Sequence, residues 1–232
     1  MEKVDKKQAQ RTRFERLRLA LRYRLQGMAD VNPRYLKVLE AFNLAELAYG
    51  EDLRQSGVKS FIHAIEVTMV AITQLRNLAF PVETLCACLL HDVHEDYNVS
   101  LKQLKKQFGK RVALAVEYLS KVRNGEKLSN ERYFGDMSKL SESGKRALLE
   151  VYMIVVSAKG FDRINNQQTM DGVKSSNKIL ENITETEEWI LPLIKVARRR
   201  CPKQEALFEL LKLILTNQVA LLRSRHSIPA AV

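Results

Sequence analysis

Glycine and proline are scarce in this chain, which has nine and five of them among 232 residues. The alternation of apolar and polar residues that marks strands is scarce too. Because glycine and proline are the residues that most often interrupt helices and form tight turns, their scarcity favours helix along most of the chain. We therefore expect an all-α fold.

Cysteines and long apolar runs are also few. Cys86, Cys88 and Cys201 have no CxxC spacing, so the sequence suggests neither a disulfide framework nor a zinc site, and we expect small core side chains. No apolar run approaches the ~20 residues of a membrane helix, and the basic start lacks the apolar region of a secretory signal. We expect a cytoplasmic protein with no membrane partner.

Positive charge is abundant and unevenly spread. The chain has 38 Lys and Arg against 27 Asp and Glu, a net charge of +11. Residues 1–26 hold nine basic and three acidic residues, a net of +6. Phe14, Leu17, Leu21 and Leu25 recur there at helical spacing, which predicts a basic amphipathic helix. It could simply dock on the body, or it could contact nucleic acid or an acidic partner.

Helix starts and apolar periodicity divide the rest of the chain. Asp30-Val31-Asn32-Pro33 marks a new helix start, so we expect a helical extension at 1–29, a domain at 30–226 and a tail at 227–232. Residues 122–132, which include Asn124-Gly125, are predicted to be a loop. The run 147–156 is predicted to be a helix that ends near Asp162. Further helices are expected at about 34–49, 61–77, 81–95, 100–107, 109–120, 172–199 with a break near Pro192, and 203–224.

The stretch His91-Asp92-Val93-His94-Glu95-Asp96 carries the most chemistry. It follows the apolar segment 84–90, so His91 and Asp92 emerge from a buried helix. On a helix, His91, His94 and Glu95 share one face. Buried polar groups cost several kcal/mol unless they are paired or bind a metal. A lone His-Asp pair can also be a surface pair or a helix cap.

Two more residues favour a metal site over those alternatives. His63 lies upstream in an apolar segment, and Asp162 lies downstream. The order His63, His91-Asp92, Asp162 is the pattern of an HD-type phosphohydrolase. Two imidazoles and two carboxylates suit Mn²⁺, Fe²⁺ or Zn²⁺ better than Ca²⁺ or Mg²⁺.

Five ordered blocks over about 140 residues resemble the hydrolase domain of the Rel/SpoT alarmone enzymes, and most closely the small single-domain alarmone hydrolases. They are Arg54, Ser56, Gly57 and His63; Leu89 to Asp96; Phe108 to Val112; Lys159, Asp162, Arg163 and Asn166; and Glu185, Thr186, Pro192 and Leu193. The resemblance implies an HD-domain bundle of roughly eight or more helices. It also implies a hydrolase that stands alone.

The resemblance assigns roles to residues of this chain. His63, His91, Asp92 and Asp162 would be the ligands of Mn²⁺, with Fe²⁺ or Zn²⁺ as alternatives. Glu95 and Asp96 stand where the family places its catalytic acidic pair. Arg54 and Lys159 could hold phosphates, and Asn166 resembles a nucleotide-contacting Asn. The implied reaction removes the 3′-pyrophosphate of guanosine tetra- or pentaphosphate (ppGpp or pppGpp), which is alarmone degradation in the stringent response.

The sequence departs from the family pattern at several positions. Residues 58–61 differ, Asn165 stands where a His is common, and Tyr97 stands where a Thr is common. Two other functions therefore stay open. One is an HD phosphohydrolase for another nucleotide, such as NADPH or an adenine alarmone. The other is a non-catalytic HD protein that binds an alarmone or RNA, against which the intact Glu95 and Asp96 argue.

Overall fold

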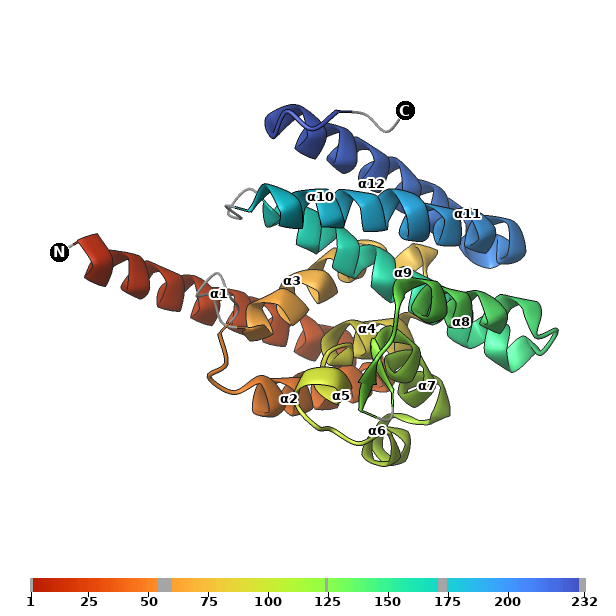
Figure 1. Cartoon of the computed structure of the whole chain (residues 1–232). Helices are drawn as coiled ribbons and strands as arrows, with labels where there is room; N and C mark the ends of the chain where they lie inside the picture. Colours follow the sequence, from red (N-terminus) through yellow and green to blue (C-terminus); the bar gives the residue numbers. More distant parts are fainter. Residues whose placement is uncertain (1, 54–59, 124, 171–174, 230–232) are drawn as a thin grey trace.

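The computed structural model describes residues 2–53, 60–123, 125–170 and 175–229, with side chains from Gln8 onward, and this part is almost entirely helical (Figure 1). The predicted all-α fold of roughly eight or more helices is confirmed. The α-helices are α1 Glu2–Val31, α2 Leu36–Tyr49, α3 Ser60–Thr73, α4 Pro81–Leu90, α5 Val93–Asp96, α6 Leu101–Phe108, α7 Lys110–Leu119, α8 Asn130–Glu142, α9 Arg146–Gln168, α10 Ser176–Glu185, α11 Leu191–Arg200 and α12 Glu205–Arg225.

Helix α9 runs through the middle of the molecule and contacts α3, α4, α7, α8, α11 and α12 (Figure 1). Its residues Val151–Ala158 are buried on all sides, which explains why an apolar run with many β-branched residues forms a helix here: it is enclosed by other helices. The helix was expected to end near Asp162, but it continues to Gln168. Asp162 is therefore held within a regular helix rather than at a loose end.

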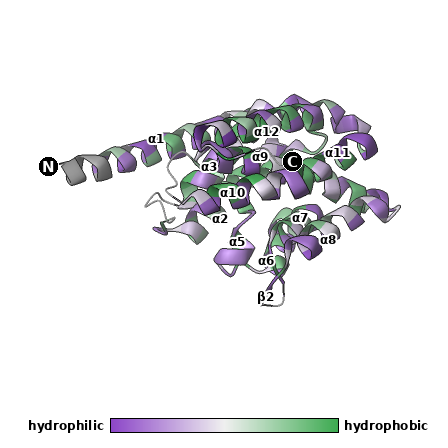
Figure 2. Cartoon of the chain, turned by 45° about the horizontal axis from the view of Figure 1, so that its top comes forward, coloured by the Kyte–Doolittle hydropathy of each residue, from purple (hydrophilic) through white to green (hydrophobic). Residues whose placement is uncertain are grey.

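Helix α1 carries the basic N-terminal segment and packs its second half on the body. Phe14, Leu21 and Leu25 belong to the main hydrophobic core and the half-buried Leu17 packs against it, as the apolar spacing predicted. The start of α1 projects from the body (Figures 1 and 2). Helix α1 ends at Val31, and Asn32 then caps a short 3₁₀ turn by accepting a hydrogen bond from the backbone of Arg34. A nucleic-acid or acidic partner for this helix stays a prediction.

The single helix expected over 81–95 is wrong, because α4 ends at Leu90 and a separate turn, α5, follows. The ring Nδ1 of His91 lies 2.8 Å from the backbone oxygen of Cys88. That oxygen would accept from residue 92 if the helix continued, and a side chain that takes it favours a break. Adjacent residues diverge by about 100° on a helix, whereas His91 and Asp92 converge at this break.

The loop expected over 122–132 is also wrong in part. Val122–Arg123 (β1) and Glu126–Lys127 (β2) form a short antiparallel hairpin, with Val122 opposite Lys127. Gly125 has φ of +80°, a conformation that favours glycine in tight hairpin turns. Helix α8 then starts at Asn130 and is capped by the hydroxyl of Ser129.

Two other helices differ from expectation in detail. Of the helix expected at 172–199 with a break near Pro192, the structure describes residues 175 onward. The interruption there is a π-helical turn at Thr186–Ile190 between α10 and α11, and Pro192 lies in the first turn of α11. The helix expected at 61–77 ends at Thr73 and is followed by a 3₁₀ turn.

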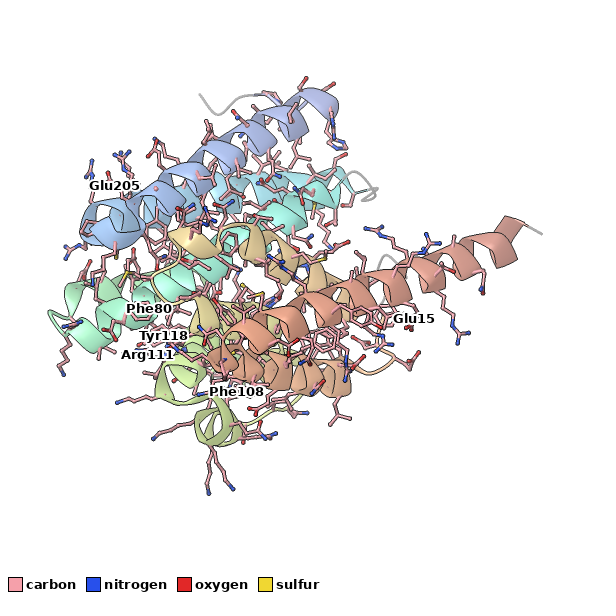
Figure 3. All side chains as sticks on the ribbon, turned by 180° about the vertical axis from the view of Figure 1, so that it is seen from behind. Glu15, Phe80, Phe108, Arg111, Tyr118 and Glu205 are labelled. Carbon is pink, nitrogen blue, oxygen red and sulfur yellow. The ribbon has the colours of Figure 1, made fainter. Side chains whose placement is uncertain are left out.

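Most helices have one apolar and one polar face, as the hydropathy colours show (Figure 2). The apolar faces meet in one large core, and a smaller cluster of Met170, Ile179, Ile183, Val219 and Leu222 lies between α10 and α12. On the surface, Arg111 stacks over Phe80 and pairs with Glu150 (Figure 3). None of the helices in the described part of the chain combines the length and apolar character that a bilayer crossing requires.

A close approach of α9 to α12 at Gly160 gives a test of this packing. A Cβ at Gly160 would lie 2.7 Å from Cδ1 of the buried Leu211, whereas a Cβ at Gly135 of α8 would meet nothing within 4 Å. Gly160→Ala should therefore lower the melting temperature by about 2–6 °C, as overpacking outweighs the helix-propensity gain. Gly135→Ala should keep or raise it. Equal shifts in calorimetry would contradict the packing described.

Candidate metal centre

Three elements bring four of the predicted site residues together. His63 comes from α3, His91 and Asp92 from the break after α4, and Asp162 from α9. The two imidazole Nε2 atoms are 3.2 Å apart. Asp92 Oδ2 lies 3.1 Å from Nε2 of His91, and Asp162 Oδ1 lies 3.0 Å from Nε2 of His63. One ligand atom each of His63, His91 and Asp92 lies within 4.8 Å of the others.

The other ring nitrogens decide what these Nε2 atoms offer. Nδ1 of His91 lies 2.8 Å from the backbone oxygen of Cys88, and Nδ1 of His63 lies 2.7 Å from Oδ1 of Asn165. Both neighbours are acceptors, so each Nδ1 carries the hydrogen. In the neutral rings both Nε2 lone pairs then converge on one point. Such an arrangement requires a proton or a cation between them, and it fits the donor set of a divalent metal.

The charges around the two rings favour positive charge at that point. Burial alone would lower the pKa of His91, but the carboxylates of Asp92 and Asp162 outweigh it and raise the pKa to about 9. Burial would raise the pKa of Asp162, yet Lys159 and the two histidines hold it well below its usual range. Asp162 is thus an ionised carboxylate inside the protein.

Lys159 and Asn166, predicted to contact substrate, both lie against Asp162. Nζ of Lys159 is 3.0 Å from Oδ2 of Asp162, and the side-chain amide of Asn166 donates to Oδ1 at 2.7 Å. Lys159 is 13% exposed in its side chain. Both residues therefore border the cluster, and in this structure they orient its buried carboxylate. Arg54, the third predicted substrate residue, lies outside the described residues.

The acidic pair Glu95 and Asp96 lies on α5, directly after the cluster. Oε2 of Glu95 accepts a hydrogen bond of 2.6 Å from the backbone N–H of Lys121, which fixes the direction of this carboxylate. Asp96 is exposed. Its pKa is raised by partial desolvation and by the negative charges of Asp92 and Glu95.

A second charged cluster lies beside the first. Glu185 of α10 pairs with Arg163, 3.0 Å away on α9, and with Nζ of Lys121 at 3.0 Å. Burial would raise the pKa of Glu185, but Arg163, Lys159 and Lys121 lower it to about 2. In this structure Arg163, one of the residues that carry the family resemblance, therefore forms a buried ion pair.

Two neighbouring residues have other partners. Nδ1 of His94 lies 2.9 Å from the backbone oxygen of Val99, so this histidine closes the turn after α5. The hydroxyl of Tyr97 donates to Asp52 at 2.6 Å, and Ser60 donates to the same oxygen at 2.8 Å.

Sequence reasoning missed Glu66 and gave Asn165 no role, although both touch the site. Asn165 accepts from His63 and donates to Glu66 at 3.1 Å. A signal for Glu66 existed: it is the one carboxylate in a helix with no other Asp, Glu, Lys or Arg, and it lies three residues after His63. On a helix such a pair shares a face.

Comparisons with known proteins agree with this geometry. Residues 41–187 match the family described as HD domain, and this range contains both histidines and both carboxylates of the cluster.

Curated relatives come from bacteria. The chain is 34% identical over 86 residues to a guanosine-3′,5′-bis(diphosphate) 3′-pyrophosphohydrolase of Aquifex aeolicus, covering 37% of this chain and 12% of that protein. It is 28% identical over 172 residues to a probable enzyme of the same name from Synechocystis, covering 72% and 21%. The bifunctional (p)ppGpp synthase/hydrolase SpoT of Escherichia coli is 28% identical over 145 residues, covering 61% and 19%. The match thus spans about a fifth or less of each relative.

The pairing of Glu185 predicts how stability depends on pH. Because its folded pKa is lowered from 4.5 to about 2, its contribution to the free energy of unfolding is present above pH 4.5 and lost as the pH falls toward 2. Glu185→Gln should cost ~2–3 kcal/mol at pH 7, and the difference from the parent should shrink below pH 4.5. Urea unfolding in EDTA at several pH values measures this. A difference that stays constant with pH would contradict the ionised pairing.

Proposed function

This chain belongs to the HD domain family, and from that premise we propose that it is a metal-dependent pyrophosphohydrolase that removes the 3′-pyrophosphate of ppGpp or pppGpp. The observation that carries the proposal is the cluster of two buried, convergent imidazole Nε2 atoms, the buried carboxylate of Asp162 and the half-buried carboxylate of Asp92, beside the acidic pair on α5. The products would be GDP or GTP and pyrophosphate, and the setting would be cytoplasmic alarmone degradation.

His63, His91, Asp92 and Asp162 would hold the metal. Mixed nitrogen and oxygen donors suit Mn²⁺, with Fe²⁺ or Zn²⁺ as alternatives. A divalent metal in such a site supplies Lewis-acid chemistry, because it lowers the pKa of water and polarises a phosphate oxygen. The chain's own contribution is to keep both imidazoles in the Nδ1–H form and to keep Asp162 ionised through Lys159.

Glu95 and Asp96 would handle the proton of the attacking water. One oxygen of Glu95 is tied to the backbone N–H of Lys121, which leaves its other oxygen to accept a proton or orient the water. Asp96 lies one residue further along α5 and is exposed. Two neighbouring carboxylates with different surroundings can divide the roles of base and acid between them.

A highly anionic substrate fits the charges near the cluster. Lys159 and Asn166 lie at Asp162, and Lys121, whose backbone N–H donates to Glu95, places its ammonium group on Glu185. We propose that Lys159 and Asn166 contact the nucleotide, as does Arg54. The names of the curated relatives favour ppGpp among the nucleotides considered.

Incubation of the purified chain with Mn²⁺ and a panel of nucleotides tests the reaction. The panel contains ppGpp, pppGpp, their adenine counterparts and NADPH, and chromatography identifies the products. Pyrophosphate and GDP from ppGpp are the expected products. Orthophosphate from NADPH, with ppGpp untouched, would replace the proposed substrate. Tight binding of ppGpp without any product would contradict catalysis.

Loss of a metal-binding carboxylate should abolish metal binding and turnover together. Asp92→Asn removes a negative charge from the cluster, so Mn²⁺ affinity and activity should both fall at least ~10²-fold, and Asp162→Asn should do the same. Asp136→Asn removes a carboxylate of α8 that pairs with Arg123 of β1 and should change neither. Metal analysis and activity are measured on one preparation. A variant with full metal content and full rate would remove that residue from the site.

Loss of an acid on α5 should separate metal binding from turnover. Glu95→Gln and Asp96→Asn should keep Mn²⁺ affinity within a few-fold but slow the reaction ~10²-fold or more, as expected when a proton acceptor or a water-orienting carboxylate is lost. Single-turnover kinetics and Mn²⁺ titration distinguish these effects. A variant that lost its metal and nothing else would place the residue among the ligands instead.

A further inference from the structure

A chain of three side chains leads from the molecular surface to His63. It starts at Arg13 on α1, passes through Glu66 on α3 and Asn165 on α9, and ends at the ring Nδ1 of His63. Its members come from three helices that are far apart in the sequence. None of the three side chains is among the metal-binding or acidic residues assigned above.

Asn165 sets the hydrogen on His63. Its Oδ1 lies 2.7 Å from Nδ1 of His63, and it is 4% exposed. An amide oxygen can only accept, so this contact keeps the hydrogen on Nδ1 and the lone pair of Nε2 toward His91. If the amide were turned around, its NH₂ group would face Nδ1 and would favour the opposite tautomer.

Glu66 decides which way the amide of Asn165 is turned. Its Oε2 lies 3.1 Å from Nδ2 of Asn165. A carboxylate accepts and cannot donate, so the NH₂ group must face Glu66 and the oxygen must face His63. A single carboxylate thereby fixes the amide, and through the amide it fixes the ring.

Arg13 in turn holds Glu66. Nη2 of the Arg13 guanidinium lies 2.7 Å from Oε1 of Glu66, whereas the amide of Asn165 donates to Oε2. The Glu66 side chain is 17% exposed and that of Arg13 is 65% exposed, so the charged pair marks where the chain of contacts reaches solvent. Figure 3 labels Glu15 on α1, which follows Arg13 by two residues in the sequence.

We propose that Asn165 and Glu66 are positioning residues for His63, and that Arg13 ties this function to the basic helix α1. The inference rests on the metal centre of the proposed function. It adds residues whose effect reaches the metal only through the orientation and tautomer of one ligand. It also makes α1 a support of the site rather than a separable extension.

Two ion pairs on α1 allow a matched comparison. Glu46 of α2 accepts from Arg18 of α1 at 2.9 Å, as Glu66 accepts from Arg13. Both carboxylates therefore bind α1, but within the described structure only Glu66 also accepts a hydrogen bond from Asn165. Glu66→Gln and Glu46→Gln each remove one charge that holds α1, and an amide at position 66 can present either end to Asn165.

The experiment measures binding of Mn²⁺ alone by electron paramagnetic resonance, with melting temperature in EDTA as a check on folding. Asn165→Leu and Glu66→Gln should weaken Mn²⁺ binding ~10-fold or more, in line with other partners of metal ligands. Glu46→Gln should leave it unchanged. Arg13→Gln, an exposed change that leaves the core intact, should weaken it ~2- to 3-fold, since an exposed ion pair contributes little.

The double variant tests whether Glu66 acts through Asn165. If it does, Glu66→Gln should add less than ~2-fold once Asn165→Leu is present, because coupled residues are not additive. Parent-like Mn²⁺ affinity in both single variants would overturn the inference and leave the proposed function standing. Equal losses in Glu66→Gln and Glu46→Gln would overturn it too, as they would reflect the docking of α1. A parent chain that bound neither Mn²⁺ nor Zn²⁺ would overturn the metal centre itself.

Discussion

The structure depends on one electrostatic constraint: the Nε2 atoms of two imidazole rings face each other, 3.2 Å apart, inside the protein. Each ring is held from behind, His91 by the oxygen of Cys88 and His63 by Asn165. Two lone pairs at that distance repel unless positive charge lies between them. The break after α4 and the central position of α9 bring the two Nε2 atoms together. The carboxylates of Asp92 and Asp162 beside them balance a positive charge held between the rings.

Around the two histidines the protein holds several ionised side chains largely out of water. Asp162 has Lys159, and Glu185 has Arg163 and Lys121. An unpaired buried charge is costly, and removal of one partner from a buried pair destabilises by about 3–5 kcal/mol. These pairs are therefore coupled to the site that they surround, because Lys159 contacts Asp162 directly and the backbone N–H of Lys121 donates to Glu95.

The sequence predicted the helical class, the burial of one face of α1 and the residues of the cluster, because these depend on composition, periodicity and short motifs. It could not predict how residues 63, 91 and 162 approach one another, since that depends on packing over about 100 residues. It placed His91 and Asp92 on a regular helix, because the hydrogen bond from the His91 ring to the backbone oxygen of Cys88 is invisible in a periodic pattern. The hairpin at Val122–Lys127 had a local signal in Asn124-Gly125, but the flanking segments were too short to indicate strands.

In the proposed metal centre, His63 and His91 both present Nε2 to a single metal ion. Anomalous diffraction at the manganese edge from crystals of the chain grown with Mn²⁺ tests it most directly. One peak is expected within bonding distance of Nε2 of His63 and Nε2 of His91, with carboxylate oxygens of Asp92 and Asp162 beside it. A peak bound by carboxylates elsewhere, or crystals whose two imidazoles remain in direct contact with no peak between them, would contradict it.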